Sequence, residues 1–334
     1  MDFRIGDVLK LLGRTMPFLV FRFLVYLGIA VAYVIAVGVG ASVGYLIGHI
    51  GDNPGAFSAW GGLVGFGAAA VALHLLREYI LYLVKAGHIA VLVELMNGKD
   101  LPQGRSQIHY AQKLVRERFV ESSVLFGVDQ LIKGILRAFN RAFLAITGIL
   151  PIPGLRGLVK IANGIFNLSL TYLDEVILAH SFHTRSENPW ESSRTALVLY
   201  AQSYKSFLTN AVFMALFIWG MTLVVFLVIL APVAALVSLF PGTASILTVV
   251  LALVVAWGVK QAVIEPVGMV ALMQVFFKVT AGQVANPEWE AKLASVSGKF
   301  GELTAKARDW RPSSGRPGGP LLPGDGTTTA AAGT

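Results

Sequence analysis

Four ionisable residues recur at intervals of four in an otherwise apolar stretch that begins at residue 122: Asp129, Lys133, Arg137 and Arg141. On an α-helix, residues four apart lie on one face, so this spacing predicts a charged stripe. The returning segment predicts a second polar stripe, with Glu175 beside it, through Lys160, Asn163, Asn167, Thr171 and Asp174. Ionisable side chains at membrane depth are costly, and they mark solute or ion paths where they occur.

If both segments cross a membrane, Asp129 lies at the depth of Asp174 and Glu175, and Lys133 meets this acidic group. Basic residues outnumber acidic ones along the rest of both stripes. The functional interpretation is therefore a hydrated path or a seam that favours anions. Two structural interpretations stay open: an ion-pair lock between two helices, and an arm at the membrane surface with a solvated basic face.

A further carboxylate lies directly before a proline. Glu265 precedes Pro266, close to Lys260 and Gln261. A proline inside a membrane helix bends it and frees backbone carbonyl groups, which together with a carboxylate can form a cation or proton site. The structural alternatives are a simple pairing of Lys260 with Glu265 and a salt bridge from Glu265 to the segment 122–182.

Enzyme chemistry is not predicted. Gly40, Ser42 and Gly44 match the G-x-S-x-G pattern of serine hydrolases, but they lie within a glycine-rich apolar helix rather than at a strand-to-helix turn. His180 and His183 lie three apart and lack the spacing of a zinc-binding helix. The chain has no cysteine, which excludes disulfides and cysteine-ligated metals. We expect no catalytic residue, no metal and no cofactor.

The composition is that of a helical membrane protein. Of 334 residues, 55% are hydrophobic and 14% charged, against about 25% charged residues in a soluble domain. Continuous apolar runs favour membrane helices over an alternating β-barrel pattern. Lysine and arginine concentrate in residues 1–22, 85–118, 185–205 and 278–316.

The distribution of basic residues predicts the topology. The positive-inside rule places the basic segments and both termini in the cytoplasm. The expected location is a bacterial plasma (inner) membrane, where the basic segments face anionic lipid headgroups. Nucleic-acid binding is a poor explanation of the net charge of +8.

Small residues predict a close contact between the first two apolar helices. Glycines recur every four residues near the end of the first helix and again near the start of the second: Gly40, Gly44, Gly48, Gly61 and Gly65. This spacing allows two helix backbones to approach closely. We interpret it as packing within one hairpin, rather than as a subunit contact or a pore lining.

Three similar units are predicted along the chain. Each consists of an amphipathic segment, two apolar helices joined by an outer turn, and a polar break that starts with asparagine, as at residues 97, 188 and 286. The units cover residues 1–96, 97–187 and 188–310, and a disordered tail follows at 311–334. The expected fold is all-α and polytopic, with about six spanning helices in three repeated hairpins, each with an adjoining cytoplasmic amphipathic helix.

The segment 122–183 decides the function that the sequence favours. The repeat favours a hairpin that crosses the membrane, whereas the basic side chains favour an arm on its cytoplasmic face. A crossing hairpin predicts a transporter- or channel-like protein that moves a small charged or polar solute. The alternative is a non-transporting scaffold or assembly factor that binds lipid or partner proteins through its amphipathic helices. Either protein could be a homo-oligomer or have a membrane partner.

Overall fold

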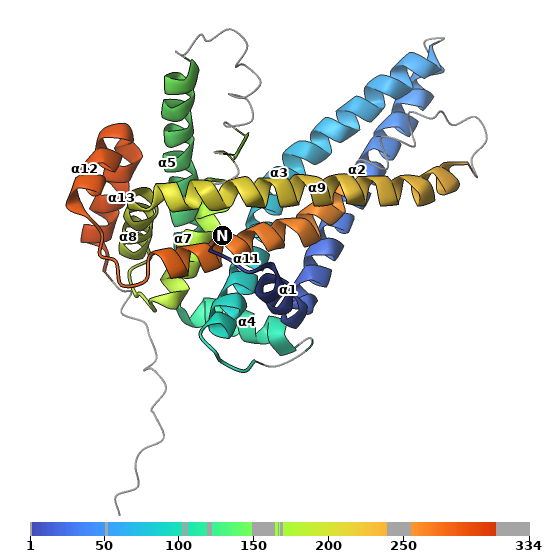
Figure 1. The fold of residues 1–334 in the computed structure, drawn as a ribbon. Coiled ribbons are helices and arrows are strands. Elements are labelled where there is room, and N and C mark those ends of the chain that lie inside the picture. The colour runs from blue at the N-terminus through green and yellow to red at the C-terminus, as the bar shows by residue number, and fades with distance from the viewer. Residues whose placement is uncertain are drawn as a thin grey trace, which may run out of the picture.

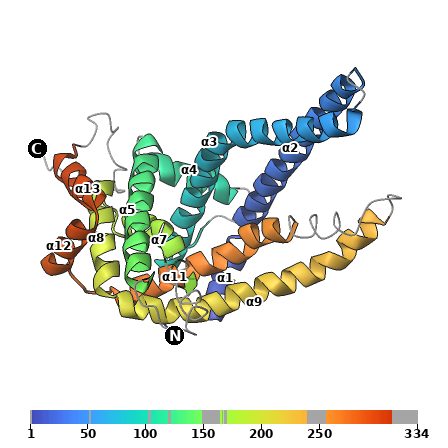
Figure 2. The ribbon, with the colours of Figure 1, turned by 90° about the horizontal axis from the view of Figure 1, so that it is seen from above.

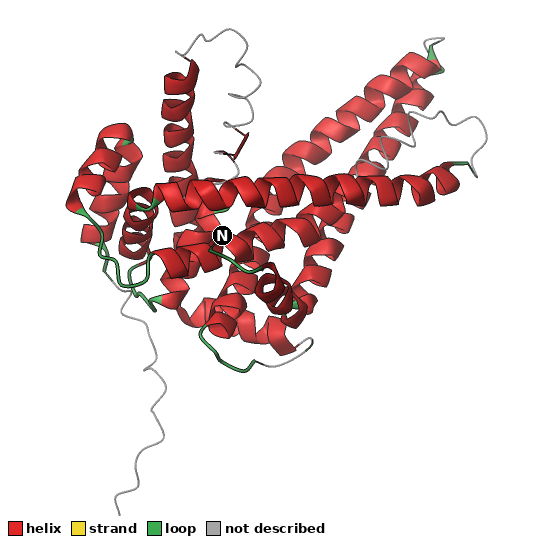
Figure 3. Cartoon of the chain, viewed as in Figure 1, coloured by secondary structure: helices red, strands yellow, loops and turns green. Residues whose placement is uncertain are grey.

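The computed structural model describes residues 2–50, 53–101, 104, 106–118, 122–148, 164–165, 167, 170–238 and 255–311. Within these residues all regular secondary structure is helical, as the sequence predicts (Figure 3). The predictions for the hairpin tip at 151–154, for Lys160 and Asn163, and for the tail at 312–334 fall outside the described residues.

The helices follow one another along the chain, and η1 is a π-helical turn that continues directly into α11. Their bounds are α1 (Ile5–Arg14), α2 (Met16–Gly48), α3 (Pro54–Met96), α4 (Ser106–Arg118), α5 (Ser122–Gly148), α7 (Leu173–His183), α8 (Pro189–Gln202), α9 (Tyr204–Val237), η1 (Lys260–Ile264), α11 (Glu265–Val279), α12 (Pro287–Val296) and α13 (Gly298–Asp309).

Within the described residues, three helices are long and apolar enough to cross a membrane: Met16–Gly48, Tyr204–Ala235 and Val255–Val279. Helices α1, α4, α7, α8 and α11 pack together in what we call the base. Figures 1 and 2 show that α2, with the first half of α3 beside it, and α9 extend far beyond this base. Large apolar side chains on them face outward, with Leu46, Leu216 and Val228 exposed to 67%, 64% and 68%. Soluble proteins rarely expose apolar surface of this extent, so these helices mark a membrane protein.

Glycines form the contact between α2 and the first half of α3, which lie side by side in both views (Figures 1 and 2). A Cβ atom added to Gly40 or Gly61 would overlap the backbone carbonyl of the other residue, and one added to Gly44 would overlap that of Phe57. Gly65 and Gly48 meet the backbone in the same way, at Ala36 and next to Pro54. The glycines that the spacing singled out therefore lie where the two backbones touch.

The base of the molecule has one apolar core to which all three predicted units contribute. Leu92 of α3, Ile135 of α5 and Phe276 of α11 are each fully buried in the same cluster of side chains. Burial of side chains of this size is the main favourable contribution to folding, at about 1.5–3 kcal/mol each. The three units consequently pack as one body rather than as separate domains.

The N-terminal helix α1 packs on the protein itself. The sequence predicts a cytoplasmic amphipathic helix beside the first hairpin, and the apolar side chains Val8 and Leu12 of this helix are buried in the core. Just before α1, the Asp2 carboxylate accepts a hydrogen bond from Asn210 Nδ2 at 2.9 Å and lies 3.2 Å from Lys278 Nζ. These two partners hold the pKa of Asp2 below its usual value.

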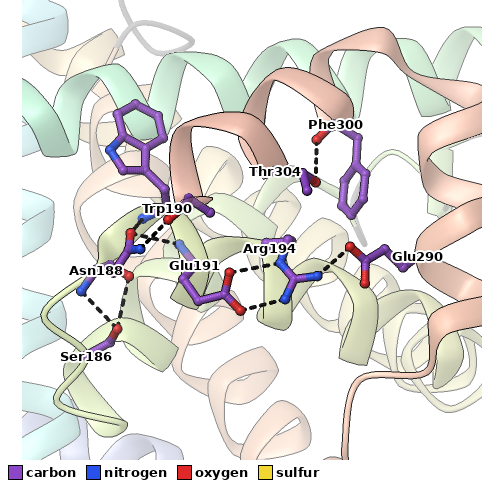
Figure 4. A network of polar contacts seen from close by, with 9 residues as sticks. Ser186, Asn188, Trp190, Glu191, Arg194, Glu290, Phe300 and Thr304 are labelled. Atoms are coloured by element: carbon purple, nitrogen blue, oxygen red, sulfur yellow. Dashed lines mark hydrogen bonds and ion pairs between the residues drawn. The ribbon is translucent and has the colours of Figure 1, made fainter. Parts of the chain in front are cut away.

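A polar network fastens the C-terminal helices α12 and α13 to α8 (Figure 4). The Asn188 side chain caps the first turn of α8 through its oxygen, while its Nδ2 donates to the Ala307 carbonyl at 2.7 Å. The Arg194 guanidinium lies 2.6 Å from Glu191 on α8 and also pairs with Glu290 on α12. The helix α8 and the asparagine that caps it therefore anchor both C-terminal helices, through one side chain each.

The glycine contact predicts a difference between two substitutions in α2. Gly44→Ala places a methyl group against the α3 backbone, so it should lower the free energy of unfolding by about 2 kcal/mol, the typical cost of overpacking. Gly38→Ala is the matched control, because a Cβ there has nothing within 4 Å, and alanine favours the helix over glycine. Thermal unfolding in detergent, followed by circular dichroism, measures both; equal midpoints would contradict the contact.

Candidate functional site

A cavity of about 240 Å³ lies in the base, where α3, α5, α7 and α8 meet. Tyr26 of α2 and Gln261 of η1 also border it, so segments from the whole chain contribute to its wall. Its charged lining consists of three carboxylates and two amines: Asp129, Asp174, Glu175, Lys85 and Lys133. A concave pocket with several convergent polar groups is the usual form of a small-molecule site.

Four of the five charged groups are arranged as two ion pairs. Lys85 Nζ of α3 lies 2.5 Å from Glu175 Oε1 of α7, which joins two helices across the cavity wall. Lys133 Nζ lies 2.7 Å from Asp129 Oδ2, one turn away on α5. Both carboxylates are buried, with side chains exposed to 6% and 8%. Pairing is what makes such burial tolerable.

The fifth charged group, Asp174, has no ion-pair partner among the described residues. Its Oδ1 is buried without a hydrogen bond, and so is Glu175 Oε2 beside it. Buried polar atoms nearly always have a hydrogen-bond partner in the protein or in water, and a buried atom left without one destabilises the fold by about 1–3 kcal/mol. The cavity therefore contains two acceptor oxygens that lack a donor from the described chain.

The rest of the predicted stripes lies away from the cavity. Arg137 and Arg141 are exposed, and each donates through Nε to a carbonyl of its own helix, at 3.2 and 3.4 Å. Asn167 is also exposed. Residues four apart drift by about 40° per step around an α-helix, so the later members of a four-residue series turn away from the face that begins it. The excess of basic groups on which an anion-favouring seam depends is therefore absent from the cavity lining.

At the second predicted site, around Glu265, the carboxylate and the backbone carbonyl both have partners within the protein. Lys260 forms an ion pair with Glu265, which is the structural alternative that the sequence left open. In a π-helical turn a carbonyl accepts from the amide five residues later, and for Gln261 that residue is Pro266, which has no N–H. Arg22 Nη2 donates to the Gln261 carbonyl at 3.2 Å instead. The carbonyl freed by the proline is thus used to join α2 to η1.

Sequence reasoning missed the importance of Arg22 and Lys85. Each lies at the edge of a long apolar run, in the basic segments 1–22 and 85–118, where a long basic side chain can reach the membrane surface. In the structure Arg22 is 3% exposed, and Lys85 lines the cavity. The available signal was a basic residue within an apolar helix. The partners are distant in sequence: the Gln261 carbonyl for Arg22 and Glu175 for Lys85.

The histidines pack against aromatic rings. His180 and His183 lie beside Phe276 and Phe277, with ring centroids 5.5 and 4.6 Å apart. Within the described residues no group of three or more histidine and acidic side chains has the arrangement of a metal site. The side chains of His180 and His183 therefore act in packing between α7 and α11.

Comparisons with protein-family models, with curated proteins and with solved structures give no match to this chain. The argument for function consequently rests on the geometry of the cavity and on the apolar helices that rise from the same base.

The Lys85–Glu175 pair predicts a non-additive pair of substitutions. Lys85→Met leaves Glu175 buried without its cation and should lower the free energy of unfolding by about 3 kcal/mol, at the low end for a buried pair because Lys85 is partly exposed. Adding Glu175→Gln should recover much of this loss, since no unpaired charge is left.

A matched control is Glu302→Gln, which breaks the exposed pair with Lys306 and should cost less than about 1 kcal/mol. Chemical denaturation in detergent measures all four proteins. If Lys85→Met lowers the free energy of unfolding no more than Glu302→Gln does, the buried pair does not stabilise the wall of the cavity.

Proposed function

We propose that this chain is a transporter- or channel-like membrane protein that moves a small charged or polar solute through the cavity between α3, α5, α7 and α8. The observation that carries the proposal is the position of the cavity. Five charged side chains line it, and two of the three apolar helices border it, through Tyr26 of α2 and Gln261 of the helix Val255–Val279. Ionisable groups at such a place are expensive unless they serve a path or a binding site.

The cavity also distinguishes this proposal from a purely structural ion-pair lock. A lock needs each charge paired and the space between helices filled. Here about 240 Å³ stays open and Asp174 lacks an ionic partner among the described residues. An engineered cavity of about 150 Å³ already accommodates benzene, so the space suits a small organic molecule.

The scaffold alternative has less support from the amphipathic helices. Such a protein would present their apolar faces to lipid or to a partner. Val8 and Leu12 of α1, and Ala111 and Val115 of α4, are instead buried within the chain. These faces are already covered, which favours the transport proposal.

The membrane arrangement that we propose has six spanning helices in three hairpins, with both termini in the cytoplasm of a plasma membrane. The pairing of α2 with α3 supports the first hairpin, and the apolar helices α9 and Val255–Val279 support the third. In the second, α5 would span together with the segment that returns to α7. The cavity would then open near the cytoplasmic side, where the basic segments lie.

The second hairpin can be tested by labelling, because the chain has no cysteine. We expect a single cysteine at Gly154 to react with a membrane-impermeant maleimide from outside intact cells, because the tip of a spanning hairpin faces outward. The matched control is Ser295→Cys on the exposed surface of α12, which should react only after permeabilisation. Labelling of the Gly154→Cys protein only after permeabilisation would place this segment on the cytoplasmic face and remove the six-helix arrangement.

Transport itself is tested by flux into proteoliposomes. Sodium, chloride, glycine and n-butylammonium serve as probes, and at least one should enter faster than into protein-free liposomes. Lys133→Gln leaves Asp129 without its cation in the cavity wall and should change that flux at least tenfold. Arg137→Gln, one turn further along α5 and exposed, should change it less than twofold. No flux of any probe, or an equal change in both variants, would contradict a path through the cavity.

A further inference from the structure

The sign of the charge in the cavity lining is informative about what binds there. Three carboxylates face two lysines, and each lysine is held by a carboxylate at 2.5 or 2.7 Å. Asp174 is the carboxylate left over. Arg22 adds a positive charge nearby but is not part of the lining; its Nη2 donates to the Gln261 carbonyl, and its Nη1 is buried without a hydrogen-bond partner.

The unpaired groups are hydrogen-bond acceptors. Asp174 Oδ1 and Glu175 Oε2 are buried and lack donors, and the Glu175 side chain is only 6% exposed. An ionised carboxylate accepts hydrogen bonds and donates none. A ligand that completes both oxygens supplies N–H or O–H donors, and a positively charged one also balances the third carboxylate of the lining. A quaternary ammonium group cannot supply the donors.

The remaining wall fits the body of an amine. Tyr26 and Tyr82 line the cavity together with apolar side chains such as Ile89 and Val128, and this part of the wall offers apolar surface to a carbon chain. The two serine hydroxyl groups in the lining are already engaged: Ser181 Oγ donates to Ser192 Oγ at 2.8 Å, and Ser193 Oγ donates to the Pro189 carbonyl at 2.6 Å. Asp174 and Glu175 thus offer the buried acceptor oxygens that still lack a donor.

We infer that the cavity binds a small protonated primary amine, with its ammonium group donating to Asp174 and Glu175 and its carbon chain lying towards the tyrosine rings. The inference deepens the proposed function, since it names the class of solute that the same site takes. It also reverses the preference for anions that the stripes of basic residues suggest in the sequence, because Arg137 and Arg141 are outside the cavity.

The test compares ligands of equal size in binding to the purified full-length chain in detergent. Isothermal titration at constant ionic strength uses n-butylammonium, and tetramethylammonium and 1-butanol as controls. All three have the same number of non-hydrogen atoms, but tetramethylammonium lacks donors and butanol lacks charge. We expect n-butylammonium to bind at least tenfold more tightly than either control.

Variants assign the binding to the two carboxylates. Asp174→Asn should weaken n-butylammonium binding at least tenfold, and Asp174→Glu should restore part of it. Arg141→Gln, an exposed change on α5, should leave the dissociation constant unchanged. If Asp174→Asn does not fold, Glu175→Gln provides the same test at the neighbouring oxygen.

Two results would overturn the inference: binding of tetramethylammonium as tight as that of n-butylammonium, or amine binding that is unchanged in both carboxylate variants. Displacement of the amine by millimolar sodium would also overturn it, by assigning the site to an inorganic cation. Binding in detergent requires no movement across a membrane. Amine binding without flux would therefore contradict the transport proposal alone, whereas flux of another probe without amine binding would contradict only the choice of solute.

Discussion

The ion pair between Lys85 and Glu175 is the interaction on which the arrangement of the base depends. A carboxylate as deeply buried as Glu175, 6% exposed, retains a cost of several kcal/mol unless a cation lies within reach. The cation comes from α3 and the carboxylate from α7, so their pairing fixes these helices against each other. The Asp129–Lys133 pair then lets α5 present a charged face to the same space.

The membrane helices are tied to this centre by two further contacts. The glycine series sets the backbone of α2 directly against that of α3. Nearer the start of α2, Arg22 lies buried inside the protein. From there Arg22 satisfies the carbonyl that Pro266 leaves without a donor. A helix from the start of the chain thereby holds the helix Val255–Val279 from near its end, and both border the cavity.

The helix α8 connects the cavity to the C-terminal part of the chain. Its Ser193 and Pro189 line the cavity, while Asn188 and Arg194 hold α13 and α12 (Figure 4). One wall of the site is thus fixed from outside by helices that do not touch the cavity themselves. Any solute that enters must fit between walls fixed by ion pairs on one side and by this polar network on the other.

The sequence by itself determined the helical class, the apolar helices and the glycines at their contact, because these depend on local composition and on spacing within one helix. It also singled out Asp129, Lys133, Asp174 and Glu175, since charge in an apolar stretch is visible without a structure. Only the tertiary structure decided which charges meet. The turn of α5 removes Arg137 and Arg141 from the cavity, and Lys85 and Arg22 find partners 90 and 239 residues away, a distance that no periodic pattern spans.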